Sequence, residues 1–198
     1  MIRELLEHDI SEGFRSILIT LYGDRIDKDP DLKDTPGRYA RSILELLKGS
    51  RDTKDQIQEV MSKKFPAKGY DEMIVVDQIE VIGVCPHHFL PIEYDVKIGY
   101  IPDQKKGNCL GLSKLARMSE LLAARAIKQE KLTVDIVDTL VKHLKPAGAG
   151  VVVVGSHGCM TCRGVKQKRS LTTTTKFYGV MKEDIRSRQE FLSYKQDR

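Results

Sequence analysis

The sequence has no tryptophan, few aromatic residues and only four cysteines among its 198 residues. It also has no run of about 18 to 20 apolar residues, the length that a membrane-spanning helix requires. The first residues, Met-Ile-Arg-Glu-Leu-Leu-Glu, lack the basic stretch and apolar segment of a secretory signal. These absences predict a cytoplasmic protein that does not interact with a membrane.

The charge of the chain does not indicate a nucleic-acid partner. The formal net charge is +5, and the basic residues are spread along the chain rather than gathered in one patch. We therefore expect no nucleic acid to bind. Local groups of lysine and arginine can still hold the phosphates of a small anionic molecule. With 40% hydrophobic residues, the chain is also able to bury a core.

Hydrophobic periodicity predicts helices at the start of the chain. Residues 9–22 carry apolar side chains at helical spacing. A second helix is expected to begin with Thr35 as its N-cap and Pro36 in its first turn, and to end at Gly49. We expect residues 1–50 to form an N-terminal helical segment and residues 51–198 to form the main domain.

The main domain is expected to alternate between strands and two long helices. The predicted order is strand, strand, helix, helix, strand, strand, which favours an α+β fold with two helices packed on one face of an antiparallel sheet. The threonine run from Thr172 to Thr175 is explained by β propensity alone. The strands are expected over 72–84, 94–100, 150–155 and 170–181, and the helices over 113–128 and 131–144.

Cysteine and histidine are concentrated in two short segments, each after an apolar strand. The first segment is Cys85-Pro86-His87-His88, and the second is His157-Gly158-Cys159-Met160-Thr161-Cys162. In a reducing compartment these residues are better explained as metal ligands than as disulfides. The Cys-x-x-His spacing lets a thiolate and an imidazole bind one metal ion, and the second segment can supply a further ligand. We therefore expect a composite zinc site.

The spacing leaves the kind of zinc site open. Four ligands, namely Cys85, His88, Cys159 and Cys162, would form a closed structural site, whereas three would leave a position for water and catalysis. A non-enzymatic zinc module and a zinc hydrolase are both consistent with it. Nucleoside and base deaminases use similar ligands, but their signature requires His-x-Glu before Pro-Cys-x-x-Cys. No His-x-Glu occurs in this sequence.

Three further motifs favour a catalytic site through a family resemblance. They are Gly-Leu-Ser-Lys-Leu-Ala-Arg at 111–117, Gln-Glu-Lys-Leu-Thr at 129–133 and Arg-Gly-Val at 163–165. With the two Cys/His segments, in this order, the chain resembles the type I GTP cyclohydrolase family from about Asp34 to Met181. A nitrile reductase shares the fold of that family, but it would need a nucleophilic cysteine and no zinc triad.

The resemblance implies a tunnelling fold for the catalytic domain, 51–198, in which antiparallel sheets of several subunits join into a barrel. The usual assembly is a decamer of two face-to-face rings of five, with active sites between subunits. The implied reaction opens the imidazole ring of GTP, releases formate and forms 7,8-dihydroneopterin triphosphate, the first step of folate, pterin or deazaguanine synthesis. Many family members have glutamate where this chain has Pro86.

The resemblance also implies the roles of individual residues. The zinc ligands are Cys85, His88 and Cys159, and Cys162 stays outside the metal site. His157 is the expected general acid, with His87 assisting and Ser113 acting at the sugar. The expected substrate-binding residues are Glu130 and Gln129 for guanine, and Ser113, Lys114, Arg117, Arg163, Arg38 and Arg41 for the sugar and triphosphate.

Overall fold

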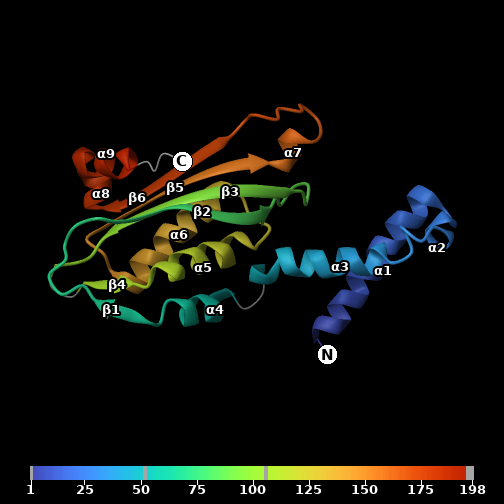
Figure 1. Ribbon diagram of the computed structural model, residues 1–198, viewed down its shortest axis with the longest axis horizontal. Helices are drawn as coiled ribbons and strands as arrows, with labels where there is room; N and C mark the ends of the chain where they lie inside the picture. The colour runs from blue at the N-terminus through green and yellow to red at the C-terminus, as the bar shows by residue number, and fades with distance from the viewer. Residues whose placement is uncertain (1, 51–52, 105–106, 195–198) are drawn as a thin grey trace. The chain divides into compact units, whose positions relative to one another are not determined.

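The computed structural model describes residues 2–50, 53–104 and 107–194, and the chain divides into two compact units, Met1–Lys48 and Gly49–Arg198. The first unit contains helices α1 (Ile2–Tyr22), α2 (Arg25–Lys28) and α3 (Thr35–Leu46) (Figure 1). Helices α1 and α3 pack together, and the rings of Phe14 and Tyr39 stack with their centroids 3.7 Å apart.

Helix α3 begins one residue earlier than predicted. Asp34 is the N-cap, and Thr35 is already helical, with its hydroxyl donating to the backbone oxygen of Asp31 in the preceding turn. The prediction of Thr35 as the N-cap was therefore wrong. Pro36 does lie in the first turn, where a missing backbone donor costs nothing. The helix ends at Leu46, before the predicted Gly49.

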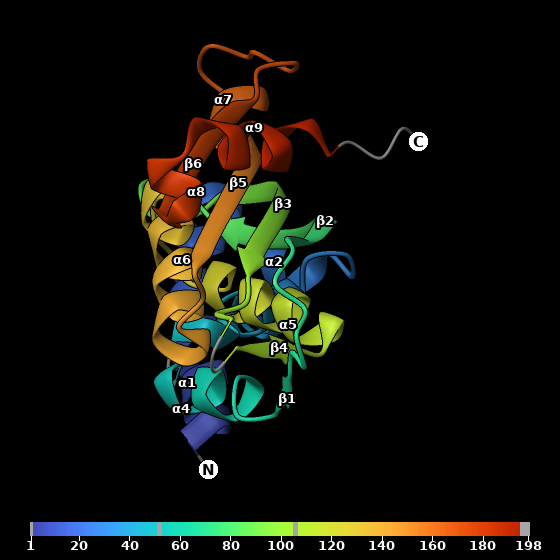
Figure 2. The same ribbon diagram turned by 90° about the vertical axis from the view of Figure 1, so that its left-hand side faces the viewer.

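The second unit is built on an antiparallel sheet. Among the described residues the sheet has four strands in the order β2-β3-β5-β6. Helices α5 (Leu112–Ala123) and α6 (Gln129–Leu144) pack together on one face of it (Figures 1 and 2). The predicted α+β fold, with N-terminal helices before it, is confirmed. The strands are β2 (Ile74–Val84), β3 (Pro91–Ile101), β5 (Gly148–His157) and β6 (Thr172–Gly179).

The core lies between the sheet and these two helices. Alternate residues of β3, from Tyr94 to Tyr100, are buried against apolar residues of α5 and α6, as the period of a strand requires. The opposite face of β3 carries Lys97 and Gly99. Part of that face is covered by α8 (Val180–Glu183) and α9 (Ile185–Ser193), whose Phe191 contacts Gly99.

Several element ends differ from the predictions because tertiary contacts override local propensity. The first long helix was predicted to reach residue 128, but α5 ends at Ala123, since Ala126 forms a β-bridge to Val84. The last strand was predicted to reach Met181, but β6 ends at Gly179. The φ of Gly179 is +57°, and a side chain there would meet the backbone oxygen of Ala147.

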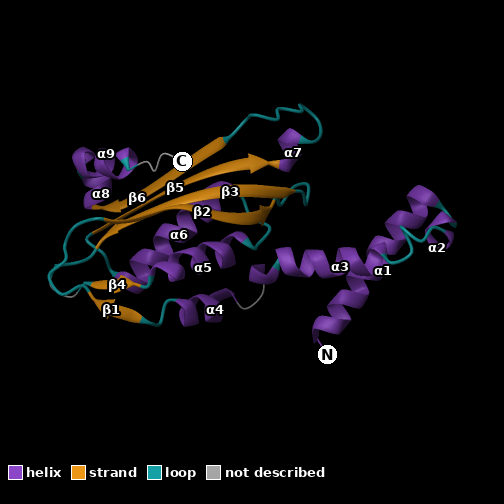
Figure 3. Cartoon of the chain, in the orientation of Figure 1, coloured by secondary structure: helices purple, strands orange, loops and turns teal. Residues whose placement is uncertain are grey.

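Some short elements were not predicted at all (Figure 3). Strands β1 (Lys64–Pro66) and β4 (Asn108–Leu110) pair as a small separate sheet beside α4 (Thr53–Val60). A 3₁₀ turn, η1 (Lys48–Ser50), precedes α4, and α7 (Gly158–Thr161) follows β5. In the part of the chain that the structure describes, no helix has both the length and the apolar character needed to cross a membrane.

Candidate active site

The two Cys/His segments lie side by side because neighbouring strands end at the same edge of the sheet. Val84 at the end of β2 pairs with Pro91 at the start of β3, and the next residue, Ile92, pairs with His157 at the end of β5. The turn over 85–90 is therefore adjacent to α7. A side chain at Gly158 would come within 2.8 Å of the backbone oxygen of Pro91, so glycine permits this close approach.

Cys85, His88 and Cys159 form a group that could hold a metal ion. One ligand atom from each residue lies within 4.8 Å of the other two, and Cys85 Sγ is 3.7 Å from His88 Nδ1. Two backbone hydrogen bonds, from Cys85 N to Leu90 O and from Phe89 N to Cys85 O, close the turn that presents the first two ligands. The structure thus brings the three predicted ligands together.

The chemistry of these donors fits zinc. Two sulfur atoms and one imidazole nitrogen form a ligand set that zinc binds in proteins. Burial and the neighbouring Cys85 thiol raise the pKa of Cys159, whereas Arg163 opposes this shift. A bound cation would stabilise both thiolates at once. Cys162 is not part of the group, and its exposed thiol donates to the backbone oxygen of Gly158 at 2.8 Å.

His157 lies two residues before Cys159 and is held by a buried glutamine. Its Nε2 is 2.7 Å from Oε1 of Gln129, the first residue of α6. The ring of Tyr94 meets the imidazole edge-on, with the centroids 6.1 Å apart. Burial lowers the pKa of His157, and the carboxylate of Glu130 acts in the opposite direction. Gln129, which His157 contacts, directly precedes Glu130 in the first turn of α6.

Tyr94 lies among the groups of the candidate site. Its side chain is buried, and its pKa is raised by burial and by the charges of Cys85, Glu130 and Cys159. Glu130 is exposed in the first turn of α6 and lies at this end of the sheet. His87 is also exposed, and its Nδ1 is 4.0 Å from Cys85 Sγ. Sequence reasoning did not identify Tyr94, which it placed only in a strand.

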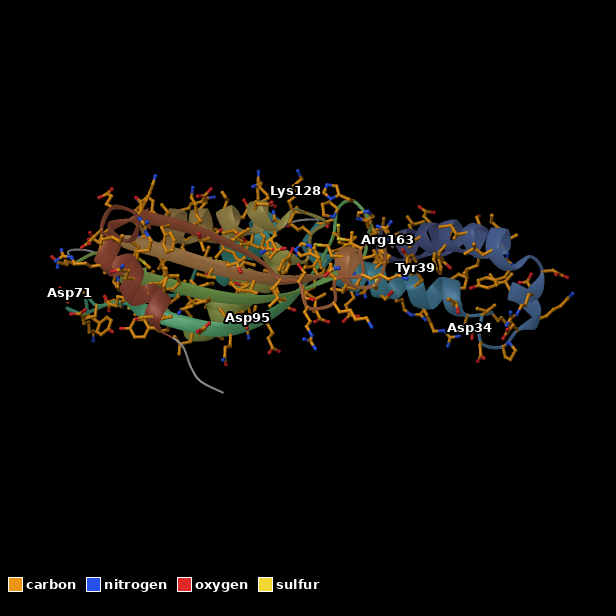
Figure 4. The ribbon with its side chains drawn as sticks, turned by 90° about the horizontal axis from the view of Figure 1, so that it is seen from above. Asp34, Tyr39, Asp71, Asp95, Lys128 and Arg163 are labelled. Atoms are coloured by element: carbon orange, nitrogen blue, oxygen red, sulfur yellow. The ribbon has the colours of Figure 1, made fainter. Side chains whose placement is uncertain are left out.

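The predicted phosphate-binding residues occupy different parts of the structure. Ser113, Lys114 and Arg117 lie in the first turns of α5, and Arg163 follows α7 near Cys159. Figure 4 shows Arg163 and Lys128 toward the end of the second unit that is distant from Asp71.

Arg38 and Arg41 belong to α3 in the first unit, where they line a hollow of about 490 Å³ with Arg15 and Lys33. Arg41 also forms an ion pair with Glu7 at 3.0 Å. The binding roles of all these basic residues stay predictions.

The fold and the site define an α+β protein with a candidate metal site beside histidine and carboxylate groups. The chain belongs to the GTP cyclohydrolase I family, whose sequence profile matches residues 10–196. It is 41% identical over 185 residues to GTP cyclohydrolase 1 of Wolinella succinogenes, covering 93% of this chain and 95% of that protein. The family resemblance is therefore confirmed, and with it the tunnelling fold.

Other relatives agree over a similar span. GTP cyclohydrolase 1 of Dictyostelium discoideum is 38% identical over 189 residues, covering 94% of this chain and 78% of that protein. GTP cyclohydrolase 1 of Homo sapiens is 38% identical over 190 residues, covering 96% of this chain and 73% of that protein. The match thus extends through both units of the structure.

Proposed function

We propose that this protein is a GTP cyclohydrolase I, which opens the guanine imidazole ring of GTP, releases formate and yields 7,8-dihydroneopterin triphosphate. One observation carries the proposal: the Cys85, His88 and Cys159 group lies where β5 ends at His157, and His157 contacts Gln129, the neighbour of Glu130 at the start of α6. Membership of the family and relatives named GTP cyclohydrolase 1 over most of the chain support it.

Zinc held by these three ligands would supply an activated water for hydrolysis, because a fourth coordination position stays open. When the ring opens, a carbon–nitrogen bond of the imidazole breaks, and a residue of the chain must donate a proton to the departing nitrogen. His157 is the proposed general acid, since an imidazole gains and loses protons near neutral pH. His87, exposed beside Cys85, is proposed to assist in a second proton transfer.

Substrate recognition is proposed to rest on Glu130, on Arg163 after α7 and on basic residues in the first turns of α5. A carboxylate accepts two hydrogen bonds, which matches the ring N–H and the exocyclic amine of guanine. Lys114, Arg117 and Arg163 carry charges suited to a triphosphate, and Ser113 is proposed to act at the ribose. Arg38 and Arg41 of α3 are proposed as further phosphate contacts.

We further propose a cytoplasmic homodecamer of two pentamers with shared active sites. Strands β2 and β6 are the outer strands of the sheet among the described residues, so each has an edge that a strand from another subunit can pair with. Unprotected strand edges favour such pairing. Light scattering tests the assembly, and an active monomer would contradict it.

The proposed reaction is tested by incubating the purified protein with zinc and GTP, and with ATP as a matched control. Formate is measured directly, and the pterin product is measured by its fluorescence after oxidation. We expect both products from GTP and neither from ATP, because the amino group of adenine cannot match the contacts expected of Glu130. Binding of zinc without formate release from GTP would instead favour a non-enzymatic zinc module.

A further inference from the structure

We infer that Gln129 is a positioning residue for His157, which it holds in one ring orientation with a hydrogen on Nε2. The part of this inference that concerns turnover of GTP rests on the proposed function. The part that concerns the position of the hydrogen rests on the hydrogen-bond network alone. The family resemblance had suggested a contact between Gln129 and the guanine base instead.

The surroundings of Gln129 determine which way its amide group faces. The residue is 2% exposed, and its Nε2 is 3.0 Å from Val153 O, 2.9 Å from Thr172 O and 3.1 Å from Thr174 Oγ1. Two of these partners are backbone carbonyls, which can only accept hydrogen bonds. The amide nitrogen must therefore face them, and the amide oxygen must face His157.

Two threonine hydroxyls complete the network in one consistent direction. Thr133 Oγ1 donates to the backbone oxygen of Gln129 at 2.8 Å, so its single hydrogen is already used. The 2.6 Å contact between Thr133 and Thr174 must then be donated by Thr174, whose oxygen remains an acceptor. Gln129 Nε2 has two hydrogens for three acceptors, the two backbone carbonyls and Thr174 Oγ1, so one hydrogen is shared between two of them. Each hydroxyl donates once, and no donor faces another donor.

The direction of the amide fixes the hydrogen on the histidine ring. Oε1 of Gln129 lies 2.7 Å from His157 Nε2 and can only accept, so Nε2 must carry a hydrogen. Removing that hydrogen would place two lone pairs against each other at this distance. The hydrogen bond from Nε2 to Gln129 therefore fixes the orientation of the imidazole ring and leaves Nδ1 as the nitrogen that Gln129 does not contact.

Gly155 provides the space for this hydrogen bond. A Cβ atom on Gly155 would lie 2.5 Å from Gln129 Oε1 and 3.1 Å from His157 Nε2. It would also lie 3.0 Å from Cε1 of Tyr94, the residue paired with Gly155 across the sheet. Any side chain at this position would push the two bonded atoms apart. A guanine contact by the Gln129 side chain would likewise require this network to break.

Neutron diffraction from deuterium-exchanged crystals of the full-length protein tests the inference directly, because it locates deuterium atoms. We expect deuterium on His157 Nε2, pointing at Gln129 Oε1, and both amide deuterium atoms of Gln129 pointing away from the ring. An undeuterated Nε2, or an amide nitrogen facing the imidazole, would overturn the inference. This measurement requires no variant and no activity, so it decides the matter even if the proposed reaction is not found.

Kinetics of Gln129→Leu separate positioning from base recognition. A positioning role predicts that kcat for GTP falls by about 10-fold to 100-fold, the usual effect of removing such a supporting group, while KM changes by less than about threefold. A base contact predicts the reverse, with KM raised and kcat retained, and that result would overturn the positioning role. Ser119→Ala is the matched control, because Ser119 is fully buried and its hydroxyl only donates to Leu115 O.

Gly155→Ala provides a second variant in case Gln129→Leu does not fold. It leaves Gln129 chemically intact and disturbs the space that the hydrogen bond occupies, together with the neighbouring edge of the Tyr94 ring. We expect the same loss of kcat with little change in KM, and a neutron structure with a lengthened Nε2 to Oε1 distance. Full kcat with the two atoms displaced would show that the hydrogen bond does not support turnover.

Discussion

Replacing His157 with alanine separates metal binding from proton transfer. His157 is not needed as a ligand in the group formed by Cys85, His88 and Cys159, so the variant should retain about one zinc per subunit. Turnover should fall by a factor of ~10² to 10⁴, or roughly 3 to 5 kcal/mol in the barrier, because a positioned general acid is lost. The affinity for GTP should change little, since Glu130 and the basic residues are untouched.

The structure also predicts a stability cost for the same variant. Gln129 is 2% exposed, and its Oε1 would lose the hydrogen bond from His157 Nε2. A buried acceptor without a donor costs about 1 to 3 kcal/mol in the free energy of unfolding, with the lower value if water enters the vacated space. Denaturant unfolding measures this cost. His143→Ala is the matched control, because His143 is also partly buried but lies near the end of α6.

The assays are zinc content, GTP affinity, formate release and unfolding on the purified variant and its control. Turnover of His157→Ala within a few-fold of the parent would refute the assignment, and His87 or a water chain would have to supply the proton. Loss of zinc together with activity would show instead that His157 supports the metal site. Only retained zinc, retained GTP binding and lost formate release agree with the proposal.

Further variants test the other parts of the site. Cys162→Ser should retain zinc, because the thiol of Cys162 bonds to Gly158 O outside the metal group, whereas Cys85→Ser should lose zinc. Metal analysis measures both variants, and an equal loss of zinc in the two would indicate a four-ligand structural site. Glu130→Gln should raise KM for GTP by about 10-fold or more and retain zinc, since an amide cannot accept both guanine hydrogen bonds. An unchanged KM in steady-state assays would show that Glu130 does not recognise the base.

Much of the site could be predicted because each of the two Cys/His segments lies at the end of a strand. The apolar runs before Cys85 and Cys159 indicated buried strands, and strands of one antiparallel sheet can end at a common edge. The register that sets Val84 beside Pro91 and Ile92 beside His157 depends on pairing between distant residues. Periodicity could not specify that pairing, so the sequence indicated a shared site without its geometry.

The role of Gln129 shows that a sequence motif does not specify which way its side chains point in the fold. In the sequence, Gln129 and Glu130 are neighbours and both matched positions expected to contact the base. In the structure the helical turn directs them differently, since Gln129 is buried against β5 and β6 while Glu130 is exposed. The threonine run was explained by β propensity, yet Thr172 O and Thr174 Oγ1 accept hydrogen bonds from Gln129. Such contacts join residues that are 43 and 45 positions apart in the chain.

The central claim is that Cys85, His88 and Cys159 hold the ion on which opening of the GTP ring depends. The most direct test removes metal with a chelator, restores zinc in steps and measures formate release from GTP against zinc bound per subunit. We predict no formate without metal, a rise in proportion to bound zinc, an end point near one zinc per subunit, and no recovery in Cys85→Ser. Formate release by the metal-free protein, or none at full zinc occupancy, would contradict the account.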